Sequence, residues 1–192
     1  MSIILEPLVF DPEKRWVWNE RREINRWFPV LARIPEDVYH AADVEAHEVV
    51  VDSEKHERNH FKHTNEPPAV RVVRTRKNYL AQWAVADWLG VPWEYKTRVW
   101  MGVADVGDDI DVACTDHLAN KAMFREDERE IVSLRRNVFV WILQDTDLSW
   151  WAVGMGWANG DEYMSRHIRC GETGDYHWYI DPRDLREMET LR

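Results

Sequence analysis

Apolar residues recur along this chain with two different periods. In the first half they return every three or four residues, as on one face of an α-helix. This spacing predicts three helices, over residues 11–28, from Pro35 towards His63, and over residues 77–89, the last ended by Gly90. In the second half they fall in short runs separated by Gly, Asp and Asn, a pattern typical of β-strands.

The short apolar runs predict a strand-rich second half. The expected strands are KTRVWMGVA, DIDVACT, KAMF, VFVWILQ, SWWAVGMGW and HWYI, and a short helix, PRDLREM, follows them. Helices followed by strands indicate an α/β protein of the α+β kind, with a mixed sheet of five to six strands flanked by helices. The adjacent Trp150 and Trp151 must point to opposite faces of their strand.

The interruption NEPPAV predicts a division of the chain. Residues 1–66 would form an N-terminal helical extension and residues 67–192 the core, together one compact unit, because 192 residues suit a single domain. Two cysteines are too few for a disulfide framework, and no apolar run approaches the roughly 18 residues of a membrane span. We therefore expect a soluble intracellular protein without a membrane partner.

Charge is unevenly distributed along the chain. Residues 1–101 carry 15 Lys and Arg against 16 Asp and Glu, whereas residues 102–192 carry 10 against 19. The segment RVVRTRK contains four basic residues and no acid, which suits contact with a DNA phosphate backbone. Its basic residues are Arg71, Arg74, Arg76 and Lys77. The alternative is a solvated loop that leads into the third helix.

The densest group of acids is ADVGDDIDVACT, residues 104–115. On a strand, Asp109, Asp111 and Ala113 face one side and Val112 the other, while Asp105 precedes a turn. Carboxylates that converge there would suit Mg²⁺ or Mn²⁺, which activate water and stabilise the charge of phosphoryl transfer. The alternative is an acidic turn with solvated aspartates.

Several motifs, in this order, resemble phage and bacterial members of the restriction-endonuclease-like PD-(D/E)XK superfamily. They are LAQWAVADWLG, ADVGDDIDVACTDHLANKAMF, VFVWILQD, VGMGWANGDEYM and WYIDPRDLREMETL, and they cover roughly residues 70–190. The similarity implies a restriction-endonuclease-like fold and a phage-encoded hydrolase. Such a protein would act in the cytoplasm of the host cell, and a place in the virion stays open.

The resemblance also implies roles for individual residues. Asp105 and Asp111 match the two metal-binding acids of a Mg²⁺- or Mn²⁺-dependent deoxyribonuclease, and Asp109 is a third potential ligand. Gln82 stands where many relatives carry a helix glutamate, and Ala113 where they carry a basic residue. Both departures matter, because positioned charges supply most of the rate in phosphoryl transfer.

Three explanations account for the missing basic group. It has moved to Lys121 or Arg125 on the neighbouring strand, the chain is a degenerate member of the family, or Ala113 is an engineered change. The nuclease hypothesis thus assigns catalysis to Asp105, Asp111, Lys121 and Gln82. The alternative hypothesis is a non-catalytic structural or virion protein, whose acidic second half binds a partner with a basic surface. Self-association is open under both.

Zinc is a further alternative at two places. His56, His60 and His63 share one helix face, and Cys114, His117, His167 and Cys170 together have the composition of a Cys₂His₂ site. An exposed polar helix face, and buried free cysteines with a turn histidine, explain the same residues without metal.

Overall fold

A computed structural model describes residues 16–17, 26–55, 66–95, 103–115, 122–125, 135–145, 147–160, 162, 167–169, 176–180 and 184–192. In chain order the elements are β1 (Trp16–Val17), β2 (Arg26–Trp27), β3 (Val30–Arg33), α1 (Glu36–Lys55), α2 (Pro68–Leu89), β4 (Ile110–Thr115), β5 (Ala122–Arg125), β6 (Arg136–Gln144), β7 (Trp150–Asn159), β8 (His167–Arg169), β9 (Tyr176–Ile180) and a 3₁₀ helix, η3 (Met188–Leu191).

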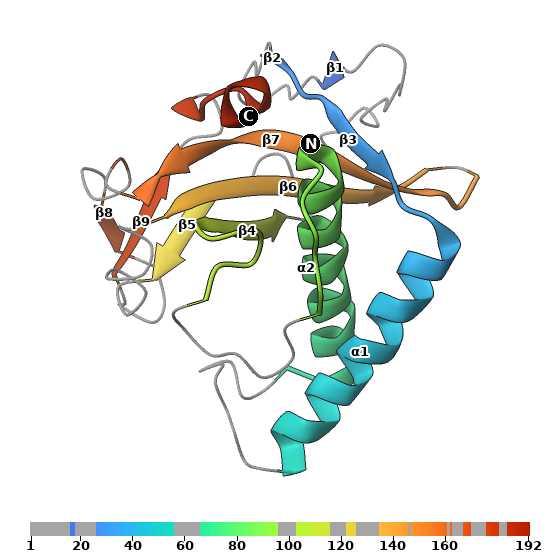
Figure 1. The fold of residues 1–192 in the computed structure, drawn as a ribbon. Helices are drawn as coiled ribbons and strands as arrows, with labels where there is room; N and C mark the ends of the chain where they lie inside the picture. Colours follow the sequence, from blue (N-terminus) through green and yellow to red (C-terminus); the bar gives the residue numbers. More distant parts are fainter. Residues whose placement is uncertain are drawn as a thin grey trace, which may run out of the picture.

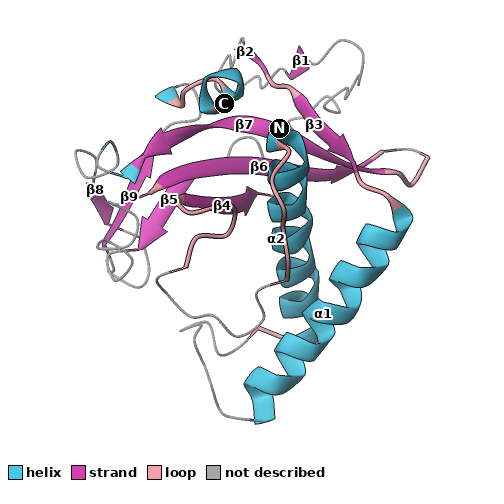
Figure 2. Cartoon of the chain, in the orientation of Figure 1, coloured by secondary structure: helices cyan, strands magenta, loops and turns pink. Residues whose placement is uncertain are grey.

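The centre of the molecule is a mixed sheet with the strand order β3-β7-β6-β4. β6 and β7 form an antiparallel hairpin, β3 pairs antiparallel with β7, and β4 runs parallel to β6. A separate antiparallel sheet, β5-β9-β8, lies at one end of the main sheet (Figure 2). The expectation of an α+β protein with a mixed sheet is confirmed, but the main sheet has four strands, not five to six, within the described residues.

Two apolar clusters lie on the two faces of the main sheet. α2 crosses one face and α1 packs beside α2 (Figure 1). Val138, Val140 and Ile142 of β6 share the cluster on that face with the helices, whereas the alternate residues Phe139 and Trp141 belong to the second cluster. Trp150 packs against the first cluster and Trp151 against the second, as the strand alternation predicts.

The third predicted helix begins earlier than its apolar pattern indicates. α2 starts at Pro68, because proline is preorganised for the first turn and has no N–H to leave unpaired there. It ends at Gly90, as predicted, in the left-handed conformation at φ 70°. Residues 71–77 therefore lie within the helix, so the alternative of a solvated loop is wrong. α1 confirms the second helix up to Lys55, and the rest of that prediction lies outside the described residues.

The helix predicted over residues 11–28 is wrong wherever that stretch is described. Trp16–Val17 and Arg26–Trp27 are extended and pair antiparallel, because β-branched and aromatic residues suit a pleated surface. β3 then joins the main sheet at its edge, so part of the expected extension contributes to the core. Near the C-terminus, Arg186 pairs with Trp157 of β7. Of the helix predicted over PRDLREM, the described residues 184–188 contain 3₁₀ structure at Asp184 and at Met188, the start of η3, and no α-helix.

No helix in the described ranges combines the length and the apolar character that a membrane span requires.

Candidate metal centre

Asp105 and Asp109 lie in the turn before the edge strand β4, and Asp111 lies on β4 itself. Val106 and Ile110 pair across the turn, with N–O distances of 3.0 and 3.3 Å. The backbone N–H of Val112 then donates to Oδ2 of Asp105 over 2.8 Å. This hydrogen bond satisfies a backbone donor of the edge strand. It also holds the Asp105 carboxylate against the strand that carries Asp111.

The side chains of β4 alternate between the faces of the sheet, as predicted. Ile110 and Val112 belong to the cluster beneath the helices, and Ala113 packs against the opposite cluster. Asp111 is two residues from Ala113 and therefore shares its face. The sheet thus places Asp111 on the face away from α2, whereas Asp105 lies at the edge.

Two arginines from the start of β6 pair with the other aspartates. Arg135 binds the Asp111 carboxylate and also donates to the carbonyl oxygen of Val103 over 3.0 Å, with its side chain 10% exposed. Arg136 donates to both oxygens of Asp109, over 2.8 and 2.7 Å, and its hydrogen bonds hold the pKa of Asp109 below the usual range. The parallel register opposes Ile110 to Arg136, which explains why these arginines reach the turn.

Gln82 lies half-buried on α2, one helical turn after Tyr79. Tyr79 is buried, and burial together with the charges of Glu45, Tyr95 and Asp105 raises its pKa to about 12. α2 contacts β4 directly. Gln82 therefore lies on the helix that covers one face of β4, whereas Asp111 lies on the other face.

The described residues contain no group of three or more His, Cys, Asp and Glu side chains arranged to hold a metal ion. Asp105, which precedes β4, and Asp111, which lies on β4, remain the two carboxylates predicted to bind a metal ion. Asp109 differs from them because both of its oxygens accept hydrogen bonds from Arg136.

The arginines predicted to contact phosphate pair with acids instead. Arg71, Arg74 and Arg76 bind Glu54, Glu66 and Asp43, so two of these ion pairs join α2 to α1. The guanidinium of Arg76 also lies 4.8 Å from the ring centre of Tyr39, and its side chain is only 15% exposed. Lys77, on the same helix, also has an interaction partner. Contact with DNA through Arg71, Arg74 or Arg76 would require them to leave or share these acids.

Several predicted site residues lie outside the described residues. One is Lys121, the predicted catalytic base, and the others are the possible zinc ligands His56, His60, His63, His117 and Cys170. The side chain of His167 is likewise outside the described part of the chain. Arg125 belongs to β5, which pairs with β9 rather than with β4. Cys114 lies half-buried on β4.

Sequence reasoning missed Arg135 and Arg136. Both directly precede the apolar run of β6, where a pair of charges normally signals only the end of a loop. Their proximity to the aspartates depends on the parallel pairing of β4 with β6, which connects segments about 25 residues apart.

No model of a known protein family matches the chain, and the searches of curated proteins and of solved structures found no significant match.

Proposed function

We propose that the chain is a PD-(D/E)XK-like protein that cleaves DNA phosphodiesters with the help of Mg²⁺ or Mn²⁺. The observation that supports this is the hydrogen bond from Val112 N–H to Asp105, which aligns one acid with the strand that carries the second, Asp111. A helix packed across a mixed sheet beside these acids is compatible with a restriction-endonuclease-like core. Asp105 and Asp111 are the residues that would hold the cation.

The donor set suits a hard divalent cation. Mg²⁺ is commonly held by one or two carboxylates, with water and substrate phosphate oxygens completing its shell. When bound, such an ion lowers the pKa of water and stabilises the negative charge of phosphoryl transfer. Within this chain, the hydrogen bond from Val112 orients Asp105.

Arg135 supplies the positive charge that Ala113 lacks. Its guanidinium binds Asp111 from a largely buried position. Arginine stays protonated, so it cannot remove a proton from water, but it can stabilise an oxyanion. The same ion pair competes with a cation for Asp111. We therefore propose a weak nuclease whose basic group acts through charge alone.

A nuclease assay tests this proposal on single- and double-stranded DNA with Mn²⁺ and with EDTA. The unchanged chain should cleave slowly, and EDTA should abolish cleavage. Ala113→Lys should accelerate cleavage about tenfold or more, because general-base and charge effects of a positioned group are worth at least that. Arg135→Gln should cleave more slowly than the unchanged chain, because it removes the positive charge that binds Asp111.

The variant Val51→Ser is the control, since Val51 is an exposed residue of α1 that belongs to neither apolar cluster. Cleavage that persists unchanged in EDTA, or that is equal in Arg135→Gln and the unchanged chain, would contradict the proposed chemistry.

Metal binding is tested separately from cleavage. The double variant Asp105→Asn/Asp111→Asn keeps an oxygen acceptor for Val112 N–H but removes both negative charges, so it should fold and lose Mn²⁺ binding in isothermal calorimetry. The single variant Asp109→Asn should bind Mn²⁺ like the unchanged chain. Equal Mn²⁺ affinity of the double variant and the unchanged chain would refute this metal site.

A second function, a non-catalytic binding or structural protein, is favoured by the ion pairs of α2. Arg71, Arg74 and Arg76 are neutralised by acids of the same chain, and the second half of the chain is strongly acidic. A surface of this kind suits a protein partner with a basic patch. If neither the unchanged chain nor Ala113→Lys cleaves DNA while both bind Mn²⁺, this second function is the better explanation.

A further inference from the structure

Arg136 is the first residue of β6, and it connects the turn before β4 with the C-terminal segment. Its guanidinium donates to both oxygens of Asp109, over 2.8 and 2.7 Å, and to the carbonyl oxygen of Leu191 over 3.0 Å. Its backbone N–H donates to the carbonyl oxygen of Asp109 over 2.9 Å. Arg136 therefore holds Asp109 by its side chain and by its backbone at once.

Asp109 ends the turn that carries Asp105. Within this turn the backbones of Val106 and Ile110 pair, and the N–H of Val112 binds the Asp105 carboxylate. Asp109 directly precedes Ile110, so its position relative to β6 also fixes where the pair of Val106 and Ile110 lies. A change in how Asp109 is held would therefore be transmitted to Asp105, the first of the two proposed metal-binding acids.

The geometry of the ion pair between Arg136 and Asp109 makes it stronger than an ordinary surface pair. The two side chains are 33% and 47% exposed, and a single exposed ion pair usually contributes little to stability. Here the arginine binds both carboxylate oxygens, which fixes direction as well as distance. The carbonyl of Leu191 already orders the guanidinium, so less rotamer freedom is lost when Arg136 binds Asp109.

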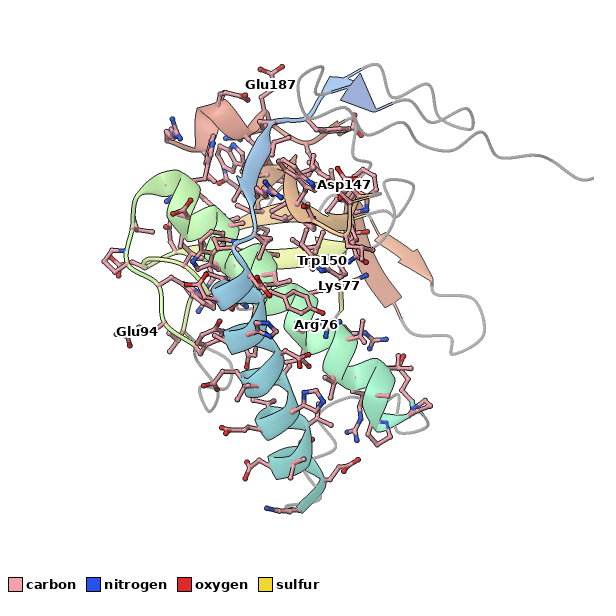
Figure 3. The ribbon with its side chains drawn as sticks, turned by 90° about the vertical axis from the view of Figure 1, so that its right-hand side faces the viewer. Arg76, Lys77, Glu94, Asp147, Trp150 and Glu187 are labelled. Atoms are coloured by element: carbon pink, nitrogen blue, oxygen red, sulfur yellow. The ribbon has the colours of Figure 1, made fainter. Side chains whose placement is uncertain are left out.

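The C-terminal segment that supplies the Leu191 carbonyl is itself anchored. The side chains of Met188 and Leu191 are buried in the cluster beneath the helices. Nε1–H of Trp157 on β7 is shared between the carbonyl oxygen of Glu187, over 3.2 Å, and the hydroxyl of Thr190, over 3.0 Å. Figure 3 shows Glu187 at the opposite end of the molecule from the end of α1. Arg136 is thus fixed by a segment that is packed into the core.

We propose that Arg136 is a positioning residue of the candidate metal centre, which holds the turn with Asp105 in place through Asp109. This inference rests on the function proposed above. It gives Asp109 a task other than metal binding, because both of its oxygens accept hydrogen bonds from Arg136 and the cation is left to Asp105 and Asp111. Groups that orient the ligands of a metal commonly change its affinity by tenfold or more when they are removed.

The sign of the effect on cation binding distinguishes positioning from simple charge. Arg136→Met removes a positive charge, so electrostatics alone would raise the affinity for Mn²⁺, whereas Asp109→Ala removes a negative charge and would lower it. Positioning predicts that both variants bind Mn²⁺ about tenfold more weakly than the unchanged chain, since neither holds the turn. Asp109→Asn keeps an oxygen acceptor for Arg136 and should retain the affinity. Isothermal calorimetry measures all three values.

Amide hydrogen exchange without metal tests the positioning independently of cation binding. The N–H of Val112, which binds Asp105, should exchange about tenfold faster in Arg136→Met and in Asp109→Ala than in the unchanged chain, because the turn opens more often. The N–H of Ile142, a buried residue within β6, should exchange at the same rate in all three proteins. This second amide reports whether a variant has lost stability as a whole.

Arg186→Met is the matched control. Arg186 also binds a carboxylate through two nitrogens, that of Glu162, and its side chain is 44% exposed. This ion pair does not involve the turn before β4, so its loss should leave the exchange of Val112 and the affinity for Mn²⁺ unchanged.

Three results would overturn the positioning role of Arg136. They are an unchanged exchange rate of Val112 in Arg136→Met, an equal acceleration at Val112 and Ile142, and a higher affinity of Arg136→Met for Mn²⁺. Faster exchange at Val112 alone, in a chain that binds no Mn²⁺, would show instead that Arg136 holds the turn and that the metal centre proposed above is wrong. The two proposals therefore fail in different ways.

Discussion

Tyr79 is a buried residue of α2 whose acidity is strongly changed by the fold. Tyr79 is 8% exposed, and its ring packs edge-on against the ring of Tyr95, with the two ring centres 5.3 Å apart. Burial, followed by the negative charge of Glu45, raises its pKa from the ordinary value of 10.0 to about 12. Its hydroxyl therefore stays protonated at neutral pH and well into the alkaline range, up to about pH 12.

This raised pKa predicts a loss of stability at alkaline pH. Between pH 10.0 and about 12 the tyrosine is ionised in the unfolded chain but protonated in the folded one, so the unfolded state binds fewer protons. The free energy of unfolding should then fall as pH rises, by an amount on the order of 2 kcal/mol from this group. Tyr79→Phe should show a correspondingly smaller fall in urea titrations across that range. Identical pH slopes for the two proteins would contradict the assignment.

At the scale of elements, an irregularity in β7 determines where the C-terminal segment packs. The register between β6 and β7 shifts after Phe139, which faces Gly156, so that Val140 faces Gly154. Gly156 has a φ of 134°, a conformation that side chains rarely adopt. A Cβ there would lie 2.5 Å from the carbonyl oxygen of Arg186, the residue that pairs with Trp157.

Gly156→Ala should therefore destabilise the protein by about 3 kcal/mol, because backbone strain and a clash with another backbone add. Gly107→Ala is the matched control. Gly107 also has a positive φ, 58°, but a Cβ there meets no atom within 4 Å, so its cost should be only about 1 kcal/mol. Urea denaturation measures both values. A loss for Gly156→Ala no larger than that for Gly107→Ala would show that the C-terminal segment does not pack as described.

The elements differ in how well the sequence predicts them. The end of α2 at Gly90 and the strands β4, β6 and β7 follow from local pattern, because a left-handed glycine and dense β-branched runs have few alternatives. Residues 11–28 contain apolar positions at a helical spacing, yet the described parts are strands. Pairing between distant segments overrides such a weak local preference. The spacing of apolar residues within one segment does not show which other segment it pairs with.

At the scale of the whole molecule, the candidate metal centre and the β6–β7 hairpin tip lie at opposite ends of β6. Arg135 and Arg136 approach the aspartates at its start, and Leu148 lies in the turn that follows its end. Substitutions this far apart, without shared partners, normally have additive effects. Leu148→Gly should accordingly leave the rate of DNA cleavage unchanged in the nuclease assay.

The sequence by itself determined the α+β class, the acids of the turn and the opposite orientation of Trp150 and Trp151, because periodicity and residue chemistry are local properties. Only the tertiary structure decided how the charges are paired. Arg135 reaches Asp111 through the parallel register of β4 and β6, and Arg76 reaches Asp43 through the packing of two helices. Such pairs join residues many positions apart in the sequence. Burial and strand register, rather than spacing along the chain, therefore determine which charged side chains meet.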